Sequence, residues 1–181
     1  MIGTRQARFN LALALWLVMA GVGMRLVPHP ADFAPVAAIA IFGGAMLPRK
    51  LALWVPALAM VLSDAVIGFY DYRIMAAVWS CYVLTALASS TWLKKPAIRR
   101  GAVLTLAGSV LFFVATNFAV WAWSGMYAHS WSGLMQCYAM ALPFFRNTLL
   151  SDAFYTAALF GLYAFAVHLA AKKLFAAPAH S

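Results

Sequence analysis

Residues 74–93 read IMAAVWSCYVLTALASSTWL, and this stretch decides the fold class of the chain. It has no charged side chain and roughly the 20 residues that an α-helix needs to cross a bilayer. Its only thiol, Cys81, lies about two turns from the N-terminal end of the segment, at 3.6 residues per turn. We therefore predict a transmembrane helix that places Cys81 inside the membrane.

The composition of the whole chain leads to the same class. Of 181 residues, 66% are hydrophobic and 9% are charged, and the mean hydropathy is +0.87. A water-soluble domain of this length needs far more polar surface, so we expect an integral membrane protein. The net charge of +9 arises from basic residues clustered between apolar runs, which fits contact with the lipid bilayer and no binding of nucleic acid.

Five further apolar runs accompany residues 74–93. We predict an all-α, single transmembrane domain over residues 1–181 with six transmembrane helices. The spans are expected at approximately 9–26, 33–47, 51–70, 74–93, 102–123 and 148–171. The run 33–47 is short and contains Gly43-Gly44, so it is expected to be a buried or tilted helix. The first run begins like a signal peptide but lacks a clear small-x-small cleavage site, so we expect a retained helix.

Lysine and arginine residues indicate the orientation. With six spans and both termini in the cytoplasm, three arginines lie outside: Arg25, Arg73 and Arg146. Ten basic residues then lie inside: Arg5, Arg8, Arg49, Lys50, Lys94, Lys95, Arg99, Arg100, Lys172 and Lys173. If residues 33–47 do not span, the best alternative places the N-terminus outside with a nine-to-four split. Both arrangements place Asp64, Asp71, Arg146 and Asp152 toward the exterior, which predicts an externally open site.

Four polar side chains are expected near the depth of Cys81: Asp64, Asn117, Arg146 and Asp152. Ionisable residues in a membrane are costly and usually functional, so Asp64 is expected to have a partner or a ligand. Arg146 could pair with either carboxylate, as a structural ion pair or as a ligand clamp. Asp152 could instead cap the last helix, and Asn117 could hydrogen-bond a neighbouring helix.

Three interpretations of Cys81 are open on residue type alone. The thiol could serve packing, form a disulfide with Cys137, or act as a soft thiolate ligand for a metal, including one held inside a cofactor. A thiolate buried among apolar groups needs a metal or a cation to stabilise it. His29, in the stiff segment Pro28-His29-Pro30, faces outward in the six-span arrangement and is a further candidate.

Residues 124–147 are predicted to form an outer loop rich in aromatic side chains. An aromatic belt at the membrane surface explains much of this composition, but long loops are also often lids over binding sites. Aromatic faces with a few polar groups suit a large, flat ligand that carries amides. No Walker loop, GxSxG or HExxH motif is present, so ATP hydrolysis and proteolysis have no support.

The segment 25–44, RLVPHPADFAPVAAIAIFGG, carries a resemblance together with Leu62-Ser63-Asp64 and Gly68-Phe69-Tyr70-Asp71. These residues are similar to the BtuM-like solitary cobalamin transporters, which are related to the S-components of energy-coupling factor (ECF) vitamin transporters. The match covers roughly residues 25–73. Its Pro-His-Pro…Pro-Val…Phe-Gly-Gly pattern is more specific to the family than to one vitamin.

The resemblance implies an S-component-like bundle of six helices in the bacterial inner (cytoplasmic) membrane, with a pocket open to the periplasm. It implies cobalamin (vitamin B12) as the transported ligand, with Cys81 bound to cobalt and no other cofactor. His29 and Asp64 match the family pattern as pocket residues, whereas Asn117, Arg146 and Asp152 are candidates from their depth alone. Thiolate ligation is further expected to promote loss of an axial cyanide, which leaves an enzymatic side activity open.

One departure from the related S-components concerns the partner. Those that dock on the shared ECF coupling module carry Ala-x-x-x-Ala in the first helix, whereas Ala12 and Ala14 here are followed at that spacing by Trp16 and Val18. The ECF coupling module is therefore a doubtful partner. Three alternatives stay open: a transporter of another vitamin or metal, a structural subunit, and an intramembrane enzyme with Cys81 as nucleophile, which lacks a convincing base.

Overall fold

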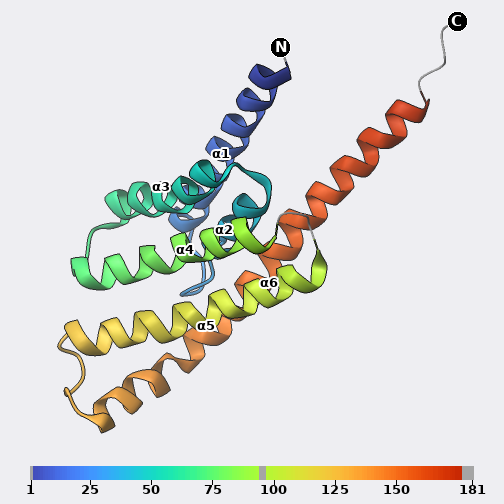
Figure 1. Cartoon of the computed structure of the whole chain (residues 1–181). Helices are drawn as coiled ribbons and strands as arrows, with labels where there is room; N and C mark the ends of the chain where they lie inside the picture. The colour runs from blue at the N-terminus through green and yellow to red at the C-terminus, as the bar shows by residue number, and fades with distance from the viewer. Residues whose placement is uncertain (1, 94–96, 177–181) are drawn as a thin grey trace, which may run out of the picture.

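The computed structural model describes residues 2–93 and 97–176, whose regular structure is entirely α-helical (Figure 1). The helices are α1 (Ile2–Leu26), α2 (Val36–Met46), α3 (Arg49–Ile67), α4 (Tyr72–Trp92), α5 (Ile98–Trp123) and α6 (Trp131–Ala176). The all-α prediction is confirmed. Within the described part, α1, α3, α4, α5 and α6 are long and apolar enough to cross a membrane, which identifies a membrane protein.

The short helix α2 lies at the centre of the bundle. Each residue of Val36–Gly44 is buried, and α2 contacts all five other helices. It carries no polar side chain, and a helix that is apolar on all sides is stable only when it is covered on all sides. The prediction of a buried helix within residues 33–47 is therefore confirmed.

Glycine allows α2 to approach α4 closely. A Cβ atom on Gly44 would lie 2.6 Å from the Cβ of Ser89 and 2.7 Å from the carbonyl oxygen of Ala86. The Ser89 hydroxyl also donates a 2.6 Å hydrogen bond to the carbonyl of Ile41. Small residues and interhelical hydroxyl bonds commonly hold membrane helices together. This crossing positions the helix that carries Cys81.

Helix α6 corrects the prediction of an outer loop at 124–147. It begins at Trp131, not near residue 148, and its 46 residues span roughly 70 Å. The ring of Phe145 stacks on that of Phe113 in α5, with centroids 4.5 Å apart. The aromatic residues that suggested a lid thus form part of a helix–helix contact, and only residues 124–130 connect α5 to α6.

Other helix ends differ from the predicted spans by up to seven residues, since α1 begins at Ile2 and not at residue 9. Helix α3 stops at Ile67 because Gly68 adopts φ 118°, a conformation that L side chains rarely adopt. Helix α1 packs on α3 and buries Leu17 completely. The first turns of α1 and the C-terminal half of α6 extend from the same side of the bundle (Figure 1).

Candidate functional site

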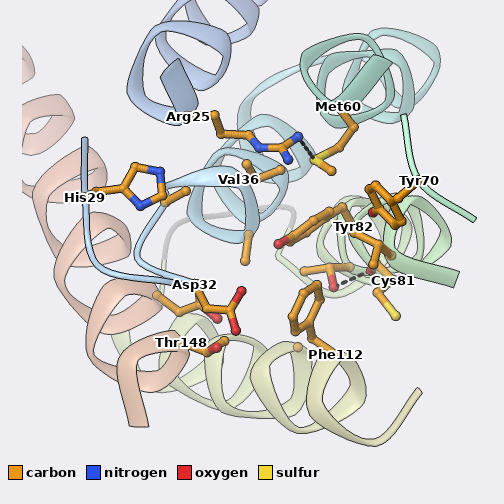
Figure 2. Close-up of a pocket in the computed structure, with 16 residues that line it drawn as sticks. Arg25, His29, Asp32, Val36, Met60, Tyr70, Cys81, Tyr82, Phe112 and Thr148 are labelled. Atoms are coloured by element: carbon orange, nitrogen blue, oxygen red, sulfur yellow. Dashed lines mark hydrogen bonds between the residues drawn. The ribbon is translucent and has the colours of Figure 1, made fainter. Parts of the chain in front are cut away.

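A cavity of about 200 Å³ lies inside the bundle, beside the N-terminal end of α2. Sixteen residues line it, from all six helices and from the connections 27–35 and 68–71. The lining residues with ionisable or hydroxyl side chains are Arg25, His29, Asp32, Tyr70, Cys81, Tyr82, Thr85, Thr148 and Asp152 (Figure 2). The fold thus collects polar groups from distant parts of the chain around one space.

Cys81 lies in the wall of this cavity. It is 3% exposed and has a free thiol, and the hydroxyl of Thr85 donates a 2.8 Å hydrogen bond to its carbonyl oxygen. The alternative of a disulfide with Cys137 is wrong, because both cysteines are free. The Cys137 thiol instead donates to the carbonyl oxygen of Asn117 at 3.4 Å, outside the cavity lining.

Asp64 does not line the cavity, but it holds a residue that does. Its Oδ1 lies 2.8 Å from Nη2 of Arg25, and its Oδ2 accepts a 2.8 Å hydrogen bond from Nε1 of Trp79. Arg25 Nη1 also donates to the hydroxyl of Ser63 at 2.7 Å. The prediction that Asp64 has a partner is confirmed. The suggestion that Arg146 is that partner is wrong, because Arg25 occupies the position.

Asp152 is a second buried carboxylate, and it does face the cavity. The Ser109 hydroxyl donates a 2.6 Å hydrogen bond to its Oδ2, and no salt bridge joins it to another described residue. The alternative of a helix cap is wrong, because α6 begins at Trp131 and Asp152 lies well inside it.

Asn117 and Arg146 do not reach the cavity. The amide of Asn117 donates a 2.7 Å hydrogen bond to the carbonyl of Phe113, one turn earlier in α5, instead of bonding a neighbouring helix. Arg146 is exposed on α6, and no ion pair within residues 2–93 and 97–176 includes it. His29 does line the cavity, with Nδ1 2.8 Å from the carbonyl oxygen of Pro30.

Three titratable groups at the cavity belong to the connections between helices, namely His29, Asp32 and Tyr70. The carboxyl group of Asp32 faces the cavity interior (Figure 2). Desolvation there raises the pKa of Asp32, and nearby His29 opposes the shift. Burial, followed by the charge of Asp64, raises the pKa of Tyr70 to about 12, while Arg25 acts in the opposite direction. Tyr70 therefore remains a neutral phenol at physiological pH.

The model of a family described as a family of unknown function, DUF6580, matches residues 5–176 of the chain. The chain belongs to this family. The matched region includes the cavity and nearly all of the six described helices. No curated protein and no solved structure matches the chain.

Several residues that line the cavity of this DUF6580 chain were not among the predicted site residues, namely Arg25, Asp32, Tyr82 and Thr85. Helical spacing could have found two of them, since Val78, Cys81, Tyr82 and Thr85 follow one face of α4. Asp32 belongs to the Pro-His-Pro-Ala-Asp motif. Arg25 offered no comparable signal, because its role depends on where α1 crosses α3.

Proposed function

We propose that this protein binds cobalamin at the periplasmic side of the bacterial inner membrane and moves it across, with Cys81 as the ligand to cobalt. The observation that supports this proposal is the free, buried thiol of Cys81 in the wall of a cavity that all six helices form. A thiolate is a soft ligand, and soft ligands suit transition metals better than hard cations.

The donor set favours a metal that arrives with most of its ligands. The described residues contain no group of three His, Cys, Asp or Glu side chains placed to hold a metal ion. One thiolate can nevertheless occupy an axial position on cobalt, because the corrin ring supplies the equatorial ligands. The metal also supplies the stabilisation that a buried thiolate needs, and the Arg25 cation lines the same cavity.

The remaining polar groups suit the amides at the edge of a corrin. Asp32 and Asp152 offer carboxylate acceptors, and the Thr148 hydroxyl, which donates to the carbonyl oxygen of Phe144, can accept a hydrogen bond. Arg25, fixed by Asp64, can donate to amide oxygens. In this proposal Asp64 therefore acts by positioning Arg25.

Binding of cobalamin requires the cavity to open. A volume of about 200 Å³ is below the roughly 300–1,000 Å³ of pockets that enclose drug-sized ligands, and a corrinoid is larger than such ligands. Tyr82 lies in the middle of the cavity, between Arg25 and Asp32 (Figure 2). We infer that the connections 27–35 and 68–71 separate and Tyr82 turns aside in a ligand-binding conformation.

The proposed topology has six membrane crossings, with α2 as a short one. The N-terminal end of α1 and the C-terminal end of α6 lie on the same side of the bundle (Figure 1). When both ends of a chain lie on the same side of a membrane, the chain crosses it an even number of times, which supports six crossings over five. The positive-inside rule then places both ends in the cytoplasm.

The decisive experiment records the visible spectrum of the purified protein with cyanocobalamin. We expect the bands of the bound corrinoid to shift for the parent and for Cys137→Ala, but not for Cys81→Ala. Cys137→Ala is a matched control because it removes the other buried thiol, which lies outside the cavity. Bound cobalamin with identical spectra in all three proteins would contradict cobalt–thiolate ligation.

A measurement of free cyanide in the same samples tests the proposed loss of cyanide. When the Cys81 sulfur replaces axial cyanide on cobalt, the thiol proton and the cyanide leave together as hydrogen cyanide, and the oxidation state of cobalt is unchanged. We expect free cyanide to accumulate with the parent and with Cys137→Ala. Equal release from Cys81→Ala would contradict this activity.

The small volume of the cavity favours one second candidate, a transporter of a smaller vitamin. In that case neither the parent nor the Cys81 variant would bind cobalamin, and a smaller ligand would stabilise both against thermal unfolding.

A further inference from the structure

A second, larger hollow lies on the outside of the bundle, between the N-terminal half of α5 and the C-terminal half of α6. It is a groove of about 800 Å³, and its lining is predominantly apolar. Small residues form much of its walls: Gly101, Ala102, Ala153, Ala157, Gly161 and Ala164. This groove is separate from the cavity around Cys81, because the two share no lining residue.

The groove follows from the way the two helices diverge. The hydroxyl groups of Thr105 and Thr156 meet at 3.4 Å where α5 and α6 touch. Beyond this contact, Phe160 and Tyr163 of α6 still pack on the ring of Phe42 in α2, and the C-terminal part of α6 then extends away from the bundle (Figure 1). Every residue from Gly161 to Lys172 is exposed. In a membrane the open side of the groove therefore faces lipid.

Three cations follow, in the chain, the residues at one end of the groove, although none of them lines it. Arg99 and Arg100 are exposed and directly follow Ile98, a groove residue that is 96% exposed. Lys172, also exposed, follows the groove residue Val167 by between one and two turns of α6. Neither of the two salt bridges found within residues 2–93 and 97–176 involves these three side chains. An apolar groove with free cations at one end is complementary to an anionic lipid.

We propose that this groove binds one anionic phospholipid, with an acyl chain along the small residues of α5 and α6 and the phosphate at Arg99, Arg100 and Lys172. Basic pockets between membrane helices are known to take such headgroups. A second copy of this chain fits less well. Two copies in the same orientation would bring their three cations to the same membrane depth, where they repel one another.

The test measures which lipid stays bound to the purified protein. The full chain is incubated with equal amounts of dioleoyl-phosphatidylglycerol and dioleoyl-phosphatidylcholine, which share acyl chains but differ in charge, and bound lipid is counted by native mass spectrometry. We expect phosphatidylglycerol to be retained preferentially. The double variant Arg99→Gln/Arg100→Gln should reduce that preference by about ten- to thirtyfold. The control Arg5→Gln/Arg8→Gln removes the same charge from α1 and should leave the preference unchanged.

A second pair of variants tests the groove itself. A Cβ on Gly161 meets no atom within 4 Å, so Gly161→Trp fills the groove without a clash at the Cβ and should prevent retention of either lipid. Gly23 on α1 is also exposed with no atom within 4 Å, so Gly23→Trp is the matched control. Equal retention of both lipids by the parent, unchanged retention in the Gly161 variant, or dimers that replace lipid adducts would overturn the proposal.

Discussion

The two buried carboxylates of the bundle, Asp64 and Asp152, are satisfied in different ways. Asp64 is paired with the Arg25 cation and accepts a further hydrogen bond from Trp79. Asp152 accepts a hydrogen bond from the hydroxyl of Ser109 and faces the cavity. A buried carboxylate paired with a cation is typical of a structural or positioning role, whereas one that faces a cavity is available to a ligand.

Breaking the Arg25–Asp64 pair should destabilise the protein strongly. Asp64 is 1% exposed and Arg25 17%, so either Arg25→Met or Asp64→Asn leaves a buried group without its partner. We expect each to lower the free energy of unfolding by about 3 kcal/mol, measured by thermal unfolding in detergent. The double variant Arg25→Met/Asp64→Leu should be more stable than Arg25→Met alone, because no unpaired charge remains.

The matched control is the exposed pair of Asp71 and Arg73 at the start of α4. The hydrogen bond from Arg73 lowers the pKa of Asp71 from 3.8 to about 2. The contribution of this pair to stability is therefore present above pH 4 and is lost as the pH falls through about 2. Asp71→Asn should change the unfolding temperature much less than Asp64→Asn. Equal losses would contradict the distinction between a buried and an exposed pair.

Among the helices, α2 shows how a short element can organise the bundle. It is only 11 residues long, yet it contacts every other helix and forms one side of the cavity through Val36 and Ala37. Its contact with α4 depends on the absence of a side chain at Gly44. Cavity shape and the position of Cys81 are therefore sensitive to the backbone distance between α2 and α4.

Gly44→Ala should destabilise the bundle by about 1–3 kcal/mol, because the new methyl group would force α2 away from Ser89 on α4. The neighbouring Gly43→Ala is the matched control. Its Cβ would make ordinary contacts of 3.7 Å with Leu17 and 3.8 Å with Leu47, and alanine favours the helix by up to ~1 kcal/mol. Thermal unfolding in detergent compares the two. An equal loss of stability in both variants would show that close approach at Gly44 is unimportant.

For the whole molecule, the membrane crossings and the cavity depend on each other. Helix α2 rises only about 17 Å, less than the roughly 30 Å hydrocarbon core of a bilayer. A crossing at α2 therefore requires parts of the neighbouring connections to enter the membrane. Irregular backbone is tolerated there when it is buried in protein or lines a cavity. The end of the connection 27–35 that adjoins α2 meets this condition, because residues 33–35 are at least partly buried and Ala34 lines the cavity.

Labelling from the two sides of the membrane tests the six-crossing topology. In a background of Cys81→Ser and Cys137→Ser, a single cysteine replaces either Ala31, which precedes α2, or Lys50, which follows it. Both residues are exposed. A membrane-impermeant maleimide should label Ala31→Cys in intact cells stripped of their outer membrane, and Lys50→Cys only after permeabilisation. Labelling of both positions from the same side would mean that α2 does not cross.

The sequence by itself determined the membrane class, the all-α fold, the approximate extents of α1 to α5, the burial of α2 and the position of Cys81 within α4. These properties depend on the length and polarity of continuous segments, which are local. The start of α6 was missed because residues 131–147 include Gly133 and Pro143 among scattered polar and aromatic residues, a composition typical of a loop.

Only the tertiary structure decided which groups meet. Arg25 rather than Arg146 pairs with Asp64, Ser109 bonds Asp152, and Cys81 stays apart from Cys137. These pairings depend on the rotation and crossing of helices that are distant in the sequence, and close packing of small residues such as Gly44 sets both. Hydropathy reports how deep a residue lies but not which way it faces, so a shared depth could not identify partners.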